Sequence, residues 1–279
     1  MKPYLTGKDY LVSQQAFTIT ECVACGLVIT NPRPTITELG KYYKAEAYTS
    51  HNDNSGGLIN YVYRLVRNYT LTQKEKLVRT INGQPGKLLD YGCGTGSFLE
   101  KCSNKGWAVY GVEPDAAAAE VAQSKSNSVV YESVESIHAL AELDVITLWH
   151  VLEHVTELKP TLTQLVEKLR KGGHLIIAVP NVAAEDATHF GQFWAALDVP
   201  RHLYHFKPTV LTELIRTFGL KLIQTVPMRF DAYYIALMST KQRDGETKYL
   251  ESVVQGFKSN WQASKTGNYS SVTYVFRKE

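Results

Sequence analysis

Short apolar runs alternate with segments of helical periodicity through the central and carboxy-terminal parts of the chain. The runs predict strands, because a strand buried on both faces needs apolar residues along its whole length. They lie at 88–89, 109–112, 143–148, 175–179, 220–226 and 271–276. The helices expected between them span 97–105, 161–169 and 208–218, with one more opened by Pro114 at its first position. Strands that alternate with helices predict an α/β protein.

Two shorter regions precede this core. Residues 1–36 are rich in polar and β-prone residues and predict a separate small unit, whereas 37–83 look helical. The apolar positions at helical spacing are Leu58, Val62, Leu65, Val66, Tyr69, Leu77, Val78 and Ile81. A glycine- and proline-containing break at 82–86 opens the core, which we place at 84–279. The irregular stretches at 181–208 and 228–268 are predicted insertions within it.

Composition and charge restrict the class of protein further. With 279 residues, 44% hydrophobic and 20% charged, the chain fits one α/β domain with appendages. A net charge of +3 without a long basic run argues against nucleic acid as a partner. No apolar stretch reaches the roughly 20 residues of a membrane span, and the amino terminus lacks a signal-peptide core. Four cysteines do not make a disulfide framework, so we expect a cytoplasmic protein whose oligomeric state stays open.

The most specific motif is a glycine turn between the first core strand and its helix, which reads DYGCGTG at 90–96. Glycine has no Cβ, so the backbone turns tightly and lies directly against a ligand. Glu113 follows the next apolar run, where an acid accepts hydrogen bonds from ribose hydroxyls. This layout predicts a nucleoside-binding βαβ unit. A dinucleotide fingerprint would have glycine in place of Ser97, which argues against a nicotinamide oxidoreductase.

The G-x-G-x-G turn, with an acid two residues before its first glycine, resembles motif I of the class I S-adenosylmethionine-dependent methyltransferases. The stretches 143–155 and 169–181 look like that family's fourth strand and its glycine turn and fifth strand, with Gly172 and Gly173 at positive φ. The resemblance implies a Rossmann-like, seven-stranded sheet with helices on both faces, a small amino-terminal ribbon and a helical lid. It also implies S-adenosylmethionine as cofactor and S-adenosylhomocysteine as product. The cofactor-binding residues it implies are Asp90, Tyr91, Gly92, Cys93, Gly94, Gly96, Glu113, Pro114, Ser133, Val134, Trp149, His150 and Val151.

The expected acceptor is a small molecule that is methylated on O, N or C. Sugar or polysaccharide precursors and phenolic or quinone-like compounds are the two classes considered. An RNA or protein methyltransferase and a non-catalytic cofactor-binding protein are the alternatives. Because the sulfonium methyl group is already activated, alignment is the main catalytic task. The segment 37–83, with Tyr42, Tyr43 and Tyr48, is expected to form a lid, and the aromatic loop 190–206 to shape the acceptor pocket.

The loop DVPRHLYHF at 198–206 lies beyond the fifth strand, over the carboxyl ends of the strands. The family often has a similar Asp-x-Pro-x-His-Leu stretch here. Histidine titrates in the range that suits removal of an acceptor proton, so His202 or His205 is the candidate base. Tyr204 and Arg201 are the candidate substrate contacts. The alternative is that this loop only caps the sheet.

Cys22 and Cys25, followed by Gly26, have the spacing of half a zinc site. They resemble the second half of the zinc-ribbon-like amino terminus of some class I methyltransferases. The matching upstream pair would fall at or before Met1, so either the chain starts after it or this copy has lost its metal. A metal-free ribbon is favoured, and zinc held with His51 or a second chain is the alternative. Whether Met1 is the natural start stays open.

The stretch His150-x-x-Glu153-His154 has a further resemblance. Certain quinone-biosynthesis O-methyltransferases and small-RNA 2′-O-methyltransferases bind a divalent metal here through acid-x-x-Glu-His. Imidazole at position 150 is a poor ligand for magnesium, so a cofactor-pocket or structural role is favoured over a metal site. Cys93 and Cys102 are expected to pack in the interior and not to act as nucleophiles.

Overall fold

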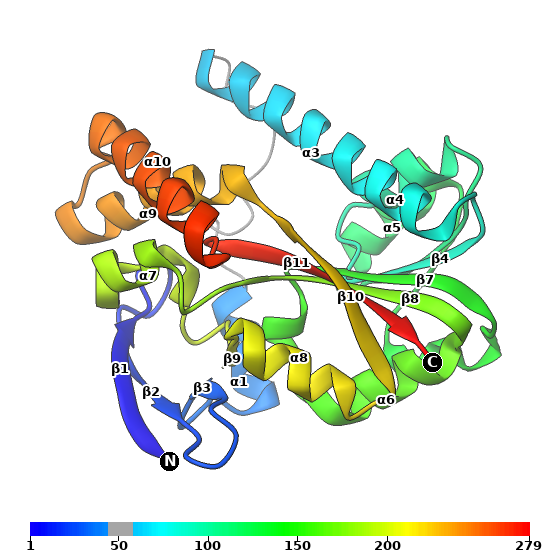
Figure 1. Ribbon diagram of the computed structural model, residues 1–279, viewed down its shortest axis with the longest axis horizontal. Helices are drawn as coiled ribbons and strands as arrows, with labels where there is room; N and C mark the ends of the chain where they lie inside the picture. Colours follow the sequence, from blue (N-terminus) through cyan, green and yellow to red (C-terminus); the bar gives the residue numbers. More distant parts are fainter. Residues whose placement is uncertain (44–57) are drawn as a thin grey trace.

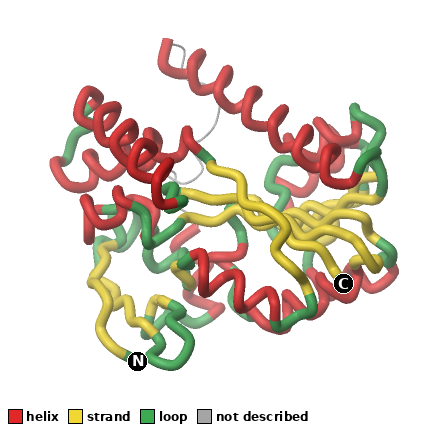
Figure 2. Tube along the Cα trace, in the orientation of Figure 1, coloured by secondary structure: helices red, strands yellow, loops and turns green. Residues whose placement is uncertain are grey.

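The computed structural model describes residues 1–43 and 58–279. It contains a seven-stranded sheet between layers of helices and a four-stranded sheet at the amino terminus (Figure 1, Figure 2). The strand order of the large sheet is β10-β11-β8-β7-β4-β5-β6, and β11 runs antiparallel to both of its neighbours. Its strands are β4 (Lys87–Tyr91), β5 (Ala108–Val112), β6 (Val129–Tyr131), β7 (Leu143–Trp149), β8 (Leu169–Pro180), β10 (Leu220–Pro227) and β11 (Ser271–Lys278). The predicted seven-stranded α/β fold is confirmed.

Helices cover both faces of this sheet because successive strand residues point to opposite sides. Leu88 packs in an apolar cluster with residues of three helices, which are α3 (Leu58–Asn82), α4 (Ser97–Ser103) and α5 (Ala116–Ser126). Leu89 packs in the cluster of the other face, with the helices η1 (Val134–Ala139), α6 (Leu158–Lys168) and α8 (Pro208–Arg216). Two adjacent leucines of β4 therefore anchor the two layers.

The strand order reverses at β4, whose neighbours β5 and β7 extend the sheet in opposite directions. In an open parallel sheet, such a reversal leaves a crevice at the carboxyl ends of the strands, where ligands bind. The glycine turn follows β4, and the residues from His150 onward follow β7. Both predicted cofactor-binding segments therefore lie at this edge.

The amino-terminal sheet consists of β1 (Lys2–Lys8), β2 (Ala16–Glu21), β3 (Val28–Thr30) and β9 (Tyr204–His205). Its fourth strand comes from the loop after β8, so the small unit shares a sheet with the core. Arg201, which is 1% exposed, forms ion pairs with Asp9 beyond β1 and with Asp198 in its own loop. These contacts fasten the amino-terminal sheet to the histidine-containing loop.

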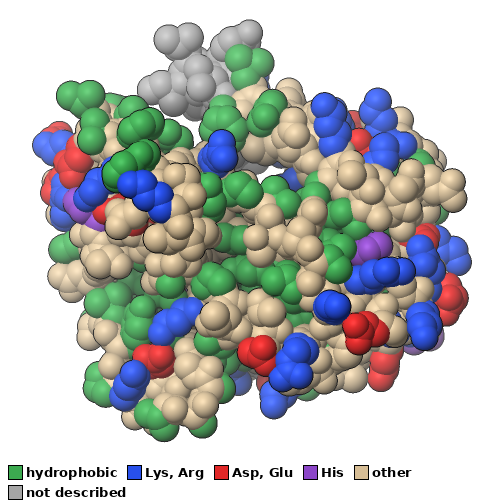
Figure 3. Space-filling model, viewed as in Figure 1, with side chains coloured by type: hydrophobic (Ala, Val, Ile, Leu, Met, Phe, Trp, Pro, Cys, Tyr) green, Lys and Arg blue, Asp and Glu red, His purple; other side chains and the backbone are tan. Residues whose placement is uncertain are grey.

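One short helix and two insertions complete the described structure. The short helix is α1 (Ile36–Tyr43). The first insertion contains α7 (Glu185–Phe190), η3 (Gly191–Phe193) and η4 (Ala195–Leu197), and the second contains α9 (Arg229–Asp244) and α10 (Tyr249–Thr266). Apolar side chains, including Leu250 and Phe257, are exposed on α10. Figure 3 shows hydrophobic side chains at the surface on the upper left of the molecule. None of the helices in the described ranges is long and apolar enough to cross a membrane.

Two local predictions are wrong. Helix α5 begins at Ala116 because the Asp115 carboxylate caps it by accepting a hydrogen bond from the Ala118 N–H at 2.8 Å, so Pro114 lies outside the helix. Gly172 has a positive φ of 74°, but Gly173 does not. A Cβ on Gly173 would lie 2.9 Å from the Arg170 carbonyl oxygen, so crowding by backbone explains this glycine.

Candidate functional site

The glycine turn joins β4 to α4 with Gly92, Gly94 and Gly96 at φ values of 75°, 53° and 74°. A Cβ on Gly92 would lie 2.5 Å from Val151 Cγ2, and a Cβ on Gly96 would lie 2.6 Å from the Cα of Ala122. A Cβ on Gly94 would meet no atom of the described residues within 4 Å. Gly92 and Gly96 therefore pack closely against Val151 and Ala122, whereas the space beside Gly94 is free of atoms of the described residues and available to a ligand.

Glu113 follows β5 and lies directly against this turn. Its Oε2 accepts a hydrogen bond from the Gly94 N–H at 2.9 Å, and its Oε1 accepts one from the Asp115 N–H at 3.0 Å. Ser133 and Val134 follow the next strand, β6, at the start of η1, and Val134 is buried. The acid and these two residues occupy the ends of adjacent strands, as a nucleoside site requires.

Asp90 is buried in β4 and is not a surface acid. Thr147 Oγ1 donates a hydrogen bond to Asp90 Oδ1 at 2.6 Å. Burial raises the pKa of Asp90 to about 7, against the stabilising effects of the Thr147 hydroxyl and the Lys74 ammonium. Tyr91, the next residue, packs half-buried against the cluster that contains Leu89. The hydrogen bond between Asp90 and Thr147 thus links β4 to β7 next to the glycine turn.

Lys74 was missed by the sequence analysis. It projects from α3, with Nζ 4.4 Å from the centre of the Trp149 ring, and its charge interacts with Asp90 and Asp231. Burial lowers the pKa of Lys74, while the two acids oppose that effect. The signal was present in the helical spacing, since Lys74 stands in the apolar stripe between Leu71 and Val78.

His150 follows β7 in a left-handed conformation with a φ of 57°. Its Nδ1 lies 3.5 Å from Glu153 Oε1, and its Nε2 lies 3.3 Å from Asp231 Oδ2. Burial opposes the charged imidazole, but the contacts with Asp231 and Glu153 outweigh it and raise the pKa of His150 to about 9. His150 is therefore an imidazolium between two carboxylates at neutral pH. Asp231, on α9, is a second residue that the sequence analysis did not identify.

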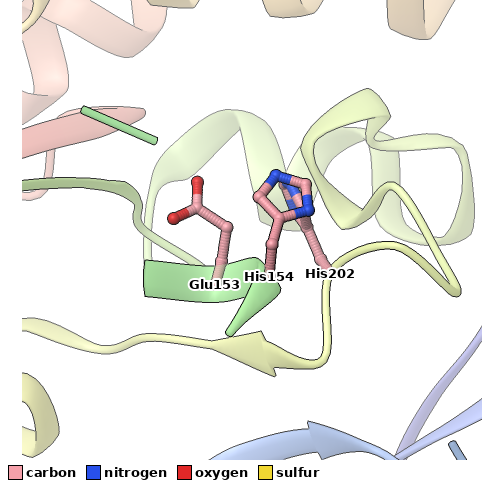
Figure 4. Close-up of side chains that lie close together, drawn as sticks. All are labelled: Glu153, His154 and His202. Carbon is pink, nitrogen blue, oxygen red and sulfur yellow. The ribbon is translucent and has the colours of Figure 1, made fainter. Parts of the chain in front are cut away.

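Glu153, His154 and His202 lie close together (Figure 4), and Glu153 is also the residue that His150 approaches. Each offers one potential ligand atom, and these atoms lie within 4.8 Å of one another. The Leu203 N–H donates a hydrogen bond to the Glu153 carbonyl at 2.8 Å, which holds the histidine loop against η2 (Leu152–His154). The candidate base His202 thus lies in one cluster with Glu153 and His154, for which a cofactor-pocket or structural role was expected.

The other candidates of the histidine loop make structural contacts. His205 is buried in β9 with Nε2 3.1 Å from Thr30 Oγ1, and burial lowers its pKa to about 3. Arg33 Nη1 donates a hydrogen bond to the Tyr204 hydroxyl at 3.1 Å. Phe190 and Trp194 of the predicted acceptor loop are buried. His202 joins the cluster with Glu153 and His154, whereas His205 contacts Thr30 of the amino-terminal sheet.

The cysteines fall into two pairs. Cys93 and Cys102 are buried in the cluster that contains Leu88, and burial raises the pKa of both thiols. Cys22 and Cys25 lie on a turn closed by a Gly26 N–H to Cys22 carbonyl bond of 2.9 Å. Within the part of the chain that the structure describes, they have no third potential metal ligand beside them. His51 and Tyr48 lie outside the described residues.

Comparisons with known sequences agree with this geometry. A family model described as a methyltransferase domain matches residues 63–225. The mitochondrial ubiquinone biosynthesis O-methyltransferase of Schizosaccharomyces pombe is 32% identical over 101 residues, which cover 33% of this chain and 37% of that protein. The ubiquinone biosynthesis O-methyltransferase of Brucella anthropi is 25% identical over 198 residues, which cover 63% of this chain and 79% of that protein. The chain spans about a third to a half of the length of several such relatives.

Solved structures show the same fold. Magnesium protoporphyrin IX methyltransferase from Synechocystis PCC 6803 with bound S-adenosylhomocysteine has a TM-score of 0.58 at 14% identity, covering 88% of this chain and 100% of that chain. The 1,6-didemethyltoxoflavin-N1-methyltransferase of Burkholderia thailandensis has a TM-score of 0.55 at 16% identity, covering 100% and 99%. The family match extends over more than half of the sequence, on the predicted sheet and glycine turn. The chain therefore belongs to the class I S-adenosylmethionine-dependent methyltransferases.

Proposed function

We propose that the protein binds S-adenosylmethionine at the carboxyl edge of the sheet and transfers its methyl group to a small-molecule acceptor, releasing S-adenosylhomocysteine. The observation that carries this proposal is the contact between Glu113 and the open glycine turn at the reversal of strand order. Membership of the methyltransferase family supports it.

The cofactor is expected to span the ends of three strands. Glu113 would accept hydrogen bonds from the ribose hydroxyls, and Ser133 and Val134 would border the adenine. The methionine end would lie along the glycine turn near Lys74, the cation that faces Trp149 and Asp90. An ammonium group there suits the carboxylate of that methionine end, because opposite charges attract most strongly where water is excluded.

The acceptor is expected beside the segment that follows β7. A phenolic or quinone-like hydroxyl is the preferred acceptor group, because the curated relatives are named for O-methylation in ubiquinone biosynthesis. A sugar or polysaccharide precursor remains the second class. In either case the protein aligns the acceptor atom with the sulfonium methyl group and excludes water. The imidazoles of His154 and His202, which lie beside Glu153, are the groups expected to contact such an acceptor.

Turnover with a labelled donor tests the proposal. The protein is incubated with S-adenosylmethionine carrying a deuterated methyl group and with matched phenolic, sugar, RNA and peptide acceptors. We expect the mass label on a phenolic acceptor, with equimolar S-adenosylhomocysteine. Transfer of the label to RNA or to a peptide would contradict the proposal that the acceptor is a small molecule. Cofactor binding without label transfer to any acceptor would favour the non-catalytic alternative.

A further inference from the structure

Helix α10 buries its small and polar side chains and exposes its large apolar ones. The buried residues are Ser252, Gln255, Gly256, Ser259 and Ala263. Its outer side, the α10 face, consists of six side chains that are 55% to 80% exposed: Tyr249, Leu250, Val253, Val254, Phe257 and Trp261. A surface helix normally has the opposite arrangement, with its apolar side inward. The α10 face is therefore the kind of surface that another molecule covers.

Hydrogen bonds fix the orientation of α10 on the neighbouring helix α7. Gln255 Nε2 donates a hydrogen bond to Glu185 Oε2 at 2.6 Å, and Ser259 Oγ donates one to Asp186 Oδ1 at 3.0 Å. Rotation of the helix would break both bonds and leave buried polar groups unpaired, which is costly. The apolar side of α10 therefore stays outward, at the outer edge of the molecule in Figure 1.

The α10 face is large enough to form one side of a stable interface. Three of its six side chains are aromatic, and each of the six is more than half exposed. At about 150–250 Å² for a whole aromatic side chain, the face offers on the order of 700 Å² of apolar surface. Specific complexes bury about 800 Å² on each partner, whereas the largest apolar patch of a monomer is usually about 300–600 Å².

The two ends of α10 carry different charges. Glu246 and Glu251 lie at its amino-terminal end, each beside a basic side chain of the same chain. Beyond Glu251 the helix contains Lys258 and Lys265 and no acid. Lys258 pairs with an acid of α7, whereas the Lys265 ammonium lies 3.5 Å from the centre of the Trp261 ring. An antiparallel second α10 would place acidic ends beside basic ends and oppose the helix dipoles, whereas a parallel one would bring like charges together.

The apolar side chains are also arranged symmetrically along the helix. In an antiparallel pair of helices centred between positions 255 and 256, Leu250 lies opposite Trp261 of the second copy, and Val254 lies opposite Phe257. A smaller side chain thus meets a larger one in each layer, which favours close packing. The same register places Glu246 opposite Lys265 of the second copy.

From the area, charge and symmetry of the α10 face, we infer that it binds the same face of a second copy of this chain. The interface is two-fold and antiparallel, so it closes at two copies. It lies on the insertion whose other helix, α9, brings Asp231 to His150 at 3.3 Å, so the dimer supports an element of the candidate site. The inference concerns assembly, and it holds or fails independently of the proposed transferase activity.

Sedimentation velocity of the full chain over a range of concentrations tests the inference. The wild type should sediment as a dimer that dissociates on dilution. Phe257→Glu places a charge in the centre of the interface and should weaken the dimer about 30-fold or more. Leu250→Glu is an independent variant if circular dichroism shows that Phe257→Glu lowers the folded fraction. Val121→Glu, at an exposed apolar position of α5, should dimerise like the wild type.

Charge reversal tests the register. Lys265→Glu and Glu246→Lys should each weaken the dimer about threefold to tenfold, since the dimer contains two such pairs. The double variant should regain the wild-type affinity. Additive losses in the double variant would contradict the antiparallel register.

Two results would overturn the inference. One is a protein that stays monomeric at every concentration. The other is a dimer that Phe257→Glu and Leu250→Glu leave unchanged, because its interface would lie elsewhere. Vesicles of phosphatidylcholine and phosphatidylglycerol are included as a separate measurement. A monomer that sediments with these vesicles, and loses that binding in Phe257→Glu, would assign the α10 face to a membrane surface instead.

Discussion

The Glu113 carboxylate accepts a hydrogen bond from the Gly94 N–H at 2.9 Å. The acid at the end of the second core strand therefore holds the middle of the glycine turn that follows the first. Its other oxygen accepts from the Asp115 N–H, so one side chain fixes the turn and the start of α5 together. The two halves of the nucleoside-binding motif are one hydrogen-bonded unit.

Replacing Gly94 and Gly96 of the glycine turn by alanine should lower the free energy of unfolding by different amounts. Gly94→Ala should cost only the left-handed conformation, about 1–2 kcal/mol, because the space around its Cβ is open. Gly96→Ala should cost about 1–3 kcal/mol more, since its Cβ would meet the Ala122 backbone. Urea unfolding of both variants measures the difference. Equal free energies of unfolding would contradict the packing described here.

The strands and the glycine turn could be predicted because their signals are local. Leu88 and Leu89 mark a buried strand, and the spacing of Gly92, Gly94 and Gly96 marks the turn. The start of α5 was misplaced at Pro114 because proline and Asp115 are both acceptable near a helix start. Here the hydrogen bond to Ala118 decided the boundary.

Lys74 should contribute to the binding of the cofactor's methionine end. Lys74→Gln should weaken binding of S-adenosylmethionine about tenfold, which is the loss expected for one charge-assisted hydrogen bond. Binding of 5′-methylthioadenosine, which lacks the carboxylate, should not change. Calorimetric titration with both compounds measures the contrast, and Lys76→Gln at an exposed position of α3 is the control. Equal losses for both compounds would refute a contact between Lys74 and the carboxylate.

Asp90 should make stability depend on pH. Its pKa is raised from 3.8 to about 7, so the folded protein keeps a proton that the unfolded chain loses. The free energy of unfolding should therefore fall as pH rises from about 4 to about 7. Relative to the wild type, Asp90→Asn should gain about 1.4 kcal/mol for each pKa unit of that shift. Denaturant unfolding at several pH values measures this gain, and a pH-independent difference would contradict it.

The buried Arg201 should be structural. Arg201→Met leaves Asp9 and Asp198 without their cation and should cost about 3–5 kcal/mol of unfolding free energy. Arg216→Met removes an exposed pair with Glu213 and should cost less than about 1 kcal/mol. Thermal and urea unfolding compare the two. Similar small losses would mean that the amino-terminal sheet does not depend on this ion-pair cluster.

The grouping of the site could not be predicted from local patterns. Glu153 and His202 are brought together by the Leu203 N–H to Glu153 carbonyl bond, which joins segments far apart in the sequence. Asp231 reaches His150 from α9, on the second insertion. Helical periodicity and motif spacing describe only near neighbours, so they identified the 150–154 stretch and His202 separately and missed Asp231.

Calorimetric titration of the wild type and Glu113→Ala with S-adenosylmethionine, S-adenosylhomocysteine and NAD tests the central claim most directly. The wild type should bind the first two compounds and not NAD. Glu113→Ala should lose about 2–3 kcal/mol of binding free energy, roughly a 30-fold to 150-fold loss of affinity, because its hydrogen bonds to the ribose are removed. Glu132→Ala, an exposed acid on the neighbouring strand end, should bind like the wild type. Binding of NAD alone, or equal affinities in wild type and Glu113→Ala, would contradict the account.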